Sequence, residues 1–292
     1  MDIGYFGIGI GALTTSEWLR PLAAAAERLG FASIWAPEHV ILLEKYSSKY
    51  PYSAGEFPMP TDTPFADPFT TLAFTAACTS KIRLATGICL VPEHNPLVLA
   101  KTVATLDRLS GGRLILGVGI GWLAEEFQAL GLSFDRRAQR TREYIDVMRK
   151  LWTEAKSSHQ GEFVSFPEVQ SFPKPHRRTV PVWFGGETPP ALRRVGEYGD
   201  GWIGFNLTPG EVAAKIDRIN SILKANGRKR ADVHLAVSPY TKPVSTDDLK
   251  PYRDAGADEV VILSLGPPSS VGEAIQRMEQ MARDFVEPAA KL

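Results

Sequence analysis

Short apolar runs recur along the chain, and each is followed by a stretch with helical periodicity. Most of these runs are continuous in Val, Ile, Leu and Trp rather than alternating, which is typical of parallel strands covered on both faces. The pattern predicts strands at residues 2–8, 33–36, 82–87, 113–119, 180–184, 201–205, 233–237 and 259–264. It predicts helices at residues 16–29, 68–79, 96–109, 136–154, 189–198, 211–225, 246–255 and 271–285. Ser16 can cap the first of these helices, and Gly30 can end it.

Eight strands alternating with eight helices is the element order of a (β/α)8 TIM barrel. A doubly wound sheet is the structural alternative, but no linker or change in composition separates two halves of the chain. We therefore expect a single α/β barrel domain over residues 1–292. Two segments are longer than a simple connection. Residues 40–66 follow strand 2 and would lie at the C-terminal rim, where barrel active sites form, whereas residues 156–179 would lie at the opposite end.

Composition narrows the class of protein. The 292 residues include 33 Lys and Arg against 33 Asp and Glu, a formal net charge of +0, and 44% are hydrophobic. The apolar content excludes global disorder, and the balanced charge argues against a nucleic-acid or membrane-surface partner. No apolar run has the length of a membrane span, and the first residues lack the pattern of a signal peptide. Cys78 and Cys89 have no disulfide-framework or metal-binding spacing, so we expect reduced, buried thiols in a cytoplasmic protein.

A strand that ends in Glu38-His39 would deliver a carboxylate and an imidazole together to the barrel rim. Histidine titrates near neutral pH and can hold or pass a proton, so the pair is a candidate for catalysis. The alternative is that His39 merely caps a loop. Glu93 and His94 form a weaker acid/base candidate, for which a pair in a surface loop is the simpler interpretation.

Three strand ends contain glycines that would let a ligand approach the backbone. Gly87 ends the third strand, where glycine permits an unusual backbone geometry beside a planar ligand. Residues 117–122, Gly-Val-Gly-Ile-Gly-Trp, lack the spacing and the acidic residue of a dinucleotide-binding loop, but would make room for something flat. Gly185, Gly186 and Thr188 precede a helix whose free N–H groups suit a phosphate, although an ordinary βα turn explains the same residues.

Other chemistry finds little support in the sequence. No metal-ligand spacing, no Ser/His/Asp series and no Cys/His nucleophile pattern stands out. Glu125-Glu126 is interpreted as the acidic first turn of a helix, and only secondarily as a cofactor contact.

Taken in order along the chain, these motifs resemble the luciferase-like monooxygenase superfamily, in particular its actinobacterial branch of oxidoreductases that depend on the deazaflavin coenzyme F420. The resemblance covers essentially the whole chain. Its most specific stretches are residues 31–35 with Glu38-His39, 95–101, 106–119, Gly121-Trp122 with Glu125-Glu126-Phe127, and 199–202. Each stretch is modest by itself, and their common order makes the resemblance strong.

The resemblance implies a flavin-type ring at the C-terminal mouth of the barrel, in front of a non-prolyl cis peptide that would fall at Gly87–Ile88. It also implies a cofactor phosphate at the glycine turn, matched here by Gly185, Gly186 and Thr188. The cofactor-binding residues expected on this basis are Glu38, Gly87, Ile88, Cys89, Gly119, Gly121, Trp122, Glu125, Gly185, Gly186 and Thr188.

In the related sugar-phosphate dehydrogenases an Asp-His pair ends strand 2, and the His acts at the substrate. Here the pair is Glu38-His39, so the resemblance makes both residues candidates for catalysis: His39 would supply or accept the proton, and Glu38 would orient it or contact the ring. Those dehydrogenases also carry an acid after the Gly-x-Gly of strand 4, where this sequence has Trp122. Because a basic pocket for a sugar phosphate is not evident either, we expect a less polar small-molecule substrate.

Three functions remain in view. The first is an oxidoreductase that transfers a hydride between coenzyme F420 and a small, fairly apolar substrate. The second is a monooxygenase that uses FMN and oxygen, since both rings fit the same pocket. The third is a non-catalytic barrel that stores or carries a flavin. The resemblance further implies a homodimer. Aromatic residues of the 40–66 insertion would form a lid over the substrate or pack onto the rim: Tyr46, Tyr50, Tyr52, Phe57, Met59 and Phe65.

Overall fold

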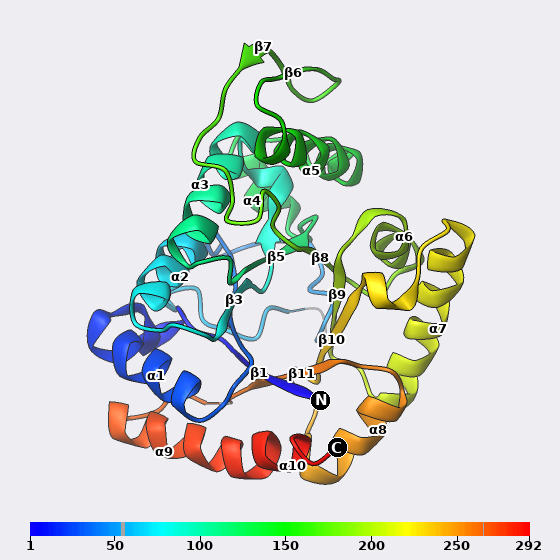
Figure 1. Ribbon diagram of the computed structural model, residues 1–292. Coiled ribbons are helices and arrows are strands. Elements are labelled where there is room, and N and C mark those ends of the chain that lie inside the picture. The colour runs from blue at the N-terminus through cyan, green and yellow to red at the C-terminus, as the bar shows by residue number, and fades with distance from the viewer. Residues whose placement is uncertain (54–55, 265) are drawn as a thin grey trace.

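Parallel strands close into a barrel with helices on the outside (Figure 1). The structure is a computed structural model that describes residues 1–53, 56–264 and 266–292, so residues 54 and 55 of the expected insertion lie outside it. The strands are β1 (Asp2–Phe6), β2 (Ser33–Ala36), β3 (Arg83–Thr86), β4 (Cys89–Leu90), β5 (Leu114–Gly119), β8 (Val182–Gly185), β9 (Gly201–Phe205), β10 (His234–Ser238) and β11 (Glu259–Leu263). Neighbouring strands pair in the order β1, β2, β3, β5, β8, β9, β10 and β11, and β11 pairs back with β1. β4 pairs with β5. The predicted barrel is confirmed.

The helices pack around this barrel close to their predicted positions. They are α1 (Ser16–Arg28), α2 (Pro68–Ala77), α3 (Pro96–Leu109), α4 (Ala124–Ala129), α5 (Arg137–Thr153), α6 (Pro189–Tyr198), α7 (Pro209–Ala225), α8 (Leu249–Asp254), α9 (Val271–Met281) and α10 (Glu287–Ala289). Asp67, Asn95, Thr208 and Ser270 cap α2, α3, α7 and α9 by accepting N–H groups of the first turn. Thr15 rather than Ser16 holds the N-cap position of α1, without a side-chain bond, so that detail of the prediction was wrong.

One strand of the barrel is interrupted. β3 and β4 both pair with β5, so they form a single strand that is broken at Gly87–Ile88. The peptide bond between these two residues is cis, as the resemblance implied. The interruption also explains why β5 has a glycine at position 117. A Cβ atom on Gly117 would lie 2.0 Å from the carbonyl oxygen of Thr86, so no larger residue fits there.

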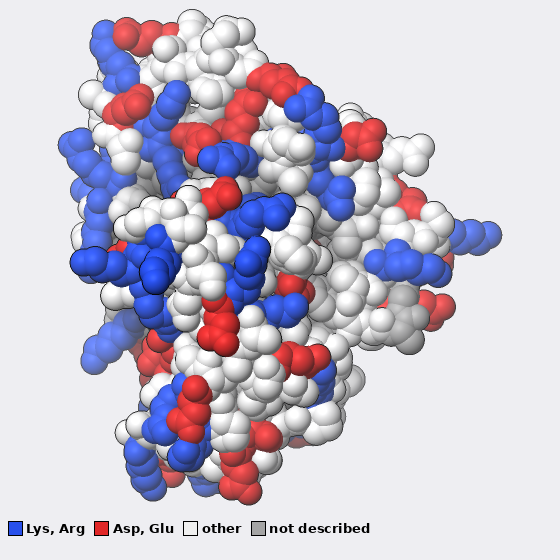
Figure 2. All heavy atoms as spheres, turned by 90° about the vertical axis from the view of Figure 1, so that its right-hand side faces the viewer, with Lys and Arg blue, Asp and Glu red and all other residues white. Residues whose placement is uncertain are grey.

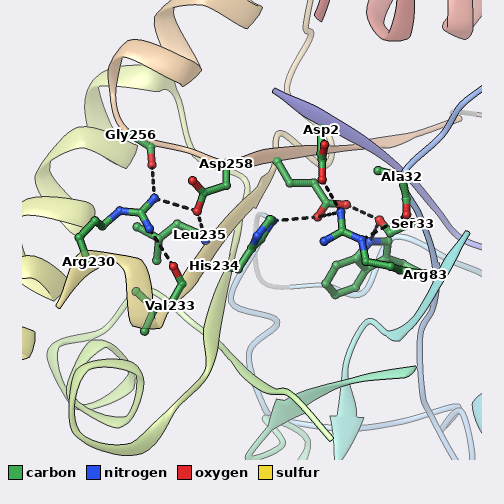
Figure 3. A network of polar contacts seen from close by, with 12 residues as sticks. Asp2, Ala32, Ser33, Arg83, Arg230, Val233, His234, Leu235, Gly256 and Asp258 are labelled. Carbon is green, nitrogen blue, oxygen red and sulfur yellow. Dashed lines mark hydrogen bonds and ion pairs between the residues drawn. The ribbon is translucent and has the colours of Figure 1, made fainter. Parts of the chain in front are cut away.

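A polar network closes the N-terminal end of the barrel (Figure 3). Glu259, which is fully buried, accepts hydrogen bonds from Ser33 and from Arg83, the latter at 3.0 Å. His234 lies 3.2 Å from the same carboxylate and stacks on Trp183 with 4.6 Å between ring centroids. Burial opposes ionisation of Glu259, but these hydrogen bonds and charges outweigh it and hold its pKa below the usual range. These side chains fill the N-terminal end of the barrel, and the cavity described below lies at the C-terminal end.

Residues 156–179, which follow α5, were expected at the N-terminal end of the barrel, but part of this segment lies elsewhere. β6 (Ser157–Gln160) and β7 (Ser165–Val169) form an antiparallel hairpin beside α5 (Figure 1). Glu143 of α5 accepts the N–H group of Phe163 at 3.0 Å, and Arg136 at the start of α5 pairs with Glu162. Because α5 begins at the C-terminal rim, the tip of the hairpin returns toward that rim, and the expected placement was wrong for this part.

The outer surface carries charges of both signs. On the face with α6 and α7, basic and acidic side chains occur together (Figure 2). Within the described ranges, no helix combines the length and the apolar character that crossing a membrane requires. Cys78 is half-buried and Cys89 is buried, and both are free thiols.

Candidate active site

A cavity of about 430 Å³ lies at the C-terminal mouth of the barrel. Ten of the residues expected to take part in catalysis or cofactor binding line it: Glu38, His39, Gly87, Ile88, Gly119, Gly121, Trp122, Gly185, Gly186 and Thr188. They come from the ends of four strands, because the carboxyl ends of parallel strands meet at one face of a barrel. The sequence therefore located the cavity, although several of these residues play a different part from the expected one.

The glycines of β5 and β8 do not leave open space for a flat ligand, as the sequence suggested. A Cβ atom on Gly119 would lie 2.4 Å from the side chain of Ile88, and one on Gly185 would lie 2.7 Å from it. The small residues therefore accommodate Ile88, which the interrupted strand projects between β5 and β8. Ile88 itself lines the cavity, so it supplies an apolar wall where a planar ring would lie.

Glu38 and His39 are neighbours in sequence but bind different partners. Glu38 is buried and accepts hydrogen bonds from the N–H group of Leu90 at 2.5 Å and from the ring of His94 at 2.9 Å. Burial disfavours the charged form of His94, but the hydrogen bond and charge of Glu38 outweigh it and raise the pKa of His94. Glu38 thus supports β4 instead of orienting His39, which corrects the expected role, and His94 is not a surface pair with Glu93.

The partner of His39 is Glu126. Nδ1 of His39 lies 2.9 Å from a carboxylate oxygen of Glu126, whose side chain is fully buried. The other oxygen accepts the N–H groups of Val40 and Ile41 at 2.8 and 3.2 Å. Glu126 therefore fixes both the imidazole and the start of the insertion, and it leaves Nε2 as the ring nitrogen available to a substrate. The sequence indicated Glu126 mainly as an acidic residue in the first turn of a helix, whereas in the structure it holds the ring of His39.

Two expected cofactor contacts do not reach the cavity. Cys89 is 0% exposed and packs in the shell between strands and helices, where burial, followed by the nearby charge of Glu38, raises the pKa of its thiol. Glu125 lies on the outside and accepts hydrogen bonds from the backbone and hydroxyl groups of Ser47 and Ser48. Alternation along β4 turns Cys89 outward, and the helical turn of α4 separates Glu125 from Glu126, so these two assignments are not supported.

The insertion covers the cavity with aromatic side chains. Tyr50, Tyr52, Phe57, Met59 and Phe65 line the cavity. Phe57 stacks on Trp122 with 6.3 Å between centroids and meets His39 edge-on at 5.0 Å. The hydroxyl of Tyr50 donates to that of Tyr240 at 2.9 Å, which joins the insertion to the end of β10. Residues of the insertion therefore cover the cavity and also pack onto the barrel rim. Trp122, which follows β5 at the rim, contacts the insertion through Phe57.

The turn before α6 offers fewer backbone donors than its glycines suggested. The first two residues of α6 are Pro189 and Pro190, which have no N–H group. Thr188 occupies the N-cap position, but its side chain makes no capping bond. The N–H donors expected of this helix start are thus reduced, and an anion here needs help from side chains.

Two arginines that the sequence analysis did not single out line the same cavity. The Nε atom of Arg194 is buried and has no hydrogen-bond partner among the described residues. Burial, and to a smaller extent the positive charge of Arg137, lowers the pKa of Arg194. Arg137 is held in place because its Nε donates to the carbonyl of Gly121 at 3.0 Å. A pair of guanidinium groups in one wall, one of them with an orphaned donor, suits a bound anion.

Two further acids in this region have unusual environments. Glu187 lines the cavity and accepts the N–H group of Phe205 at 2.8 Å, and burial raises its pKa to about 7. Glu93 lies close to Gly121 of the cavity wall, and both of its carboxylate oxygens are buried with no partner among the described residues. Burial, followed by the charges of Glu126 and Glu38, raises the pKa of Glu93 to about 9, so it is protonated at neutral pH.

The chain matches the sequence profile of the luciferase-like monooxygenase family over residues 11–250. It belongs to this family, whose members are oxidoreductases and monooxygenases. An uncharacterized protein of Mycobacterium tuberculosis, Rv0953c, is 35% identical over 281 residues, which cover 94% of this chain and 96% of the relative.

Solved structures share the fold at lower identity. An F420-dependent secondary alcohol dehydrogenase in complex with an F420-acetone adduct has a TM-score of 0.75 and 19% identity, covering 99% of this chain and 98% of that one. The oxygenating constituent of 3,6-diketocamphane monooxygenase from Pseudomonas putida, in complex with FMN, has a TM-score of 0.76 and 14% identity, covering 98% of both chains. The same barrel thus serves a deazaflavin enzyme and an FMN enzyme.

Proposed function

We propose that this protein is an oxidoreductase that binds coenzyme F420 in the cavity and transfers a hydride between it and a small, fairly apolar organic substrate. One observation carries the proposal: the same cavity is lined by His39, which Glu126 orients, and by Arg194, which has an unpartnered buried donor. An anchor for an anion suits a redox cofactor that carries a phosphate, and a group that can hold a proton suits hydride transfer to or from a carbon that bears oxygen.

The residues present fit such a cofactor. Arg194 and Arg137, with the backbone of Gly186 and the hydroxyl of Thr188, would hold the phosphate. Ile88 would support the planar ring, since its side chain lines the cavity where β3 and β4 are interrupted. When bound, the deazaflavin supplies the hydride chemistry, and the protein supplies binding, orientation and proton transfer.

The chain's own part in the reaction follows from the contacts of His39. Glu126 accepts a hydrogen bond from Nδ1 and so keeps the ring in one orientation. Nε2 then holds or accepts the proton of the substrate oxygen. Phe57 and Trp122 stack over this position, and the aromatic residues of the insertion would limit the access of water to it. Glu38, by contrast, acts on β4 through Leu90 and is assigned no proton-transfer role.

The second candidate is an FMN-dependent monooxygenase, which the shared fold with the FMN-bound Pseudomonas putida enzyme favours. Both rings would use the same anion anchor. A barrel that only carries a flavin is less well supported, because storage does not require a fully buried carboxylate that orients a histidine at the cavity wall.

Titration of the cofactor-free protein with F420 and with FMN, followed by fluorescence, tests the choice of cofactor. We expect F420 to bind more tightly, and substrate turnover to proceed without oxygen consumption. Tight FMN binding with oxygen uptake would select the second candidate, and binding of neither would contradict both.

His39→Ala tests the proton-transfer role. We expect kcat to fall by roughly 10²–10⁴-fold while F420 affinity is unchanged. His176→Ala, which removes an exposed imidazole far from the cavity, is the matched control. An unchanged kcat in His39→Ala would remove His39 from the mechanism.

A further inference from the structure

A second cavity of about 500 Å³ adjoins the first at the same end of the barrel. It lies between the ends of β1 and β11, the short 3-10 helix at Gly11–Thr14, the insertion and the start of α9. Its volume falls in the range of small-molecule sites, about 300–1,000 Å³. The cofactor and proton-transfer residues described above belong to the first cavity and leave this one unassigned.

The two cavities share part of their walls. Phe6, Ile10, Met59 and Tyr240 line both of them. Phe6 and Tyr240 meet edge-on with 6.3 Å between ring centroids, so two aromatic side chains form the boundary. Phe6 also reaches the interrupted strand, since a Cβ atom on Gly87 would lie 2.7 Å from its ring. A molecule that extends past this boundary would therefore have one end beside the redox site and the other in the second cavity.

The walls of the second cavity select against charge. Leu13, Pro58, Leu263 and Pro267 contribute apolar surface in addition to the shared residues. Among the described residues that line it, Arg277 is the one charged side chain, and it is paired with Glu273 at 2.5 Å. A charged ligand would lose its hydration here without a free partner, whereas a hydrocarbon group would gain by leaving water.

We propose that the second cavity binds an uncharged hydrocarbon part of the substrate, while the reacting carbon of the substrate lies beside His39 in the first cavity. This proposal rests on the proposed function and adds where the apolar part of the substrate binds. With a secondary alcohol as substrate, Nε2 of His39 would accept the hydroxyl proton, and the oxidised deazaflavin, when bound, would accept the hydride of the carbon that bears the hydroxyl, which gives the ketone. One O–H and one C–H bond break, a C=O bond forms, and two electrons leave with the hydride.

Isopropanol and menthol are suitable probes, because isopropanol has almost no hydrocarbon part and menthol has a bulky one. Calorimetry on the cofactor-free protein measures binding of each alcohol, and kcat/KM with F420 measures turnover. For the unaltered protein we expect menthol to bind more tightly than isopropanol and to have the higher kcat/KM. Equal affinities would overturn the proposal.

Two substitutions fill the second cavity. Ala274, 8% exposed at the start of α9, is replaced in Ala274→Phe, and Thr63 of the insertion is replaced in Thr63→Phe. We expect each to lower menthol affinity, and the ratio of kcat/KM for menthol to that for isopropanol, by roughly tenfold or more, as shape changes in apolar pockets do. Ala73→Phe on the exposed face of α2 is the control, with values equal to those of the unaltered protein.

The outcomes separate this inference from the proposed function. Menthol affinity that survives both filling substitutions overturns the second-cavity site, whatever the cofactor titration shows. Loss of menthol binding in both variants supports the site even if F420 fails to bind, because the calorimetric measurement contains no cofactor. Thr63 lies outside the helices and strands. Thr63→Phe therefore still tests binding in the second cavity if Ala274→Phe disturbs the packing of α9.

Discussion

Nδ1 of His39 lies 2.9 Å from a carboxylate oxygen of Glu126, although the two residues are 87 positions apart in the chain. Their side chains are 9% and 0% exposed, so the contact is shielded from solvent. Glu126 also accepts two N–H groups of the insertion, at Val40 and Ile41. One buried carboxylate thus links the candidate proton carrier to the segment that covers the cavity.

Glu126→Gln should impair catalysis more than stability. The amide has the same size, but its NH2 group cannot accept a hydrogen bond from either the imidazole or the backbone. We expect kcat to fall by roughly tenfold or more while cofactor affinity changes little. Steady-state kinetics beside Glu197→Gln, an exposed carboxylate of α6, tests this; equal kcat values in the two variants would contradict the orienting role.

Arg194→Gln should weaken binding of a phosphate-bearing ring but not of the ring alone. FMN and riboflavin differ by the phosphate, so their affinities for the cofactor-free protein isolate this contact. We expect FMN affinity to fall about tenfold or more, which is about 1.4 kcal/mol, with riboflavin affinity unchanged. The neighbouring Arg193 is exposed, so Arg193→Gln is the matched control. Parallel losses for both ligands would show that Arg194 acts on the ring pocket as a whole.

Glu125→Ala should loosen the lid. Hydrogen bonds from the backbone of Ser47 and the hydroxyl of Ser48 are the main cause that lowers the pKa of Glu125 to about 2. A lowered carboxyl pKa means that the contact contributes at pH values above the ordinary 4.5 and is lost as pH falls toward 2. Near neutral pH we expect faster tryptic cleavage after Lys45 and Lys49 than in an exposed control, Glu17→Ala. Unchanged cleavage kinetics would show that the contact of Glu125 with Ser47 and Ser48 does not hold the insertion in place.

Glu93→Gln should stabilise the fold. The unfolded chain loses the Glu93 proton near pH 4.5 and the folded chain near 9, so the folded state binds more protons between these values. The free energy of unfolding therefore falls as pH rises across this window and levels off above it. The substitution removes this dependence, and we expect it to add a few kcal/mol at neutral pH.

Denaturant titrations at several pH values measure the effect, with Glu197→Gln as the control. A Glu93→Gln variant that keeps the slope of the unaltered protein would show that Glu93 is ionised in the folded state. The prediction concerns stability alone and is independent of the cofactor.

Much of the architecture could be predicted from the sequence because it depends on local patterns. The runs of buried β-forming residues and the helical periodicity gave eight strands and the main helices, with α3 and α6 placed at both ends as observed. The hairpin at residues 157–169 was missed because its strands are short, mostly polar, and lie on the outside of the molecule. Glu143 of α5 holds it, and such a contact has no sequence signature.

In the candidate site, too, some residues could be predicted from the sequence and others could not. Motif order indicated the family and placed His39, Gly87 and Trp122 at one rim. It did not indicate Arg194, whose role depends on an unpartnered donor inside the cavity, nor Glu187, whose raised pKa comes from burial. A lone arginine on an amphipathic helix is in most cases a solvated residue, so its environment was the missing information.

By itself the sequence determined the barrel, its family and the strand ends that meet at the mouth, because alternation, helical period and glycine positions act over a few residues. Only the tertiary structure decided which acid holds which histidine. Adjacent side chains at a strand end point in opposite directions, so Glu38 turns to His94 while His39 turns to Glu126. Pairing across 87 residues is set by barrel closure, which no local pattern encodes.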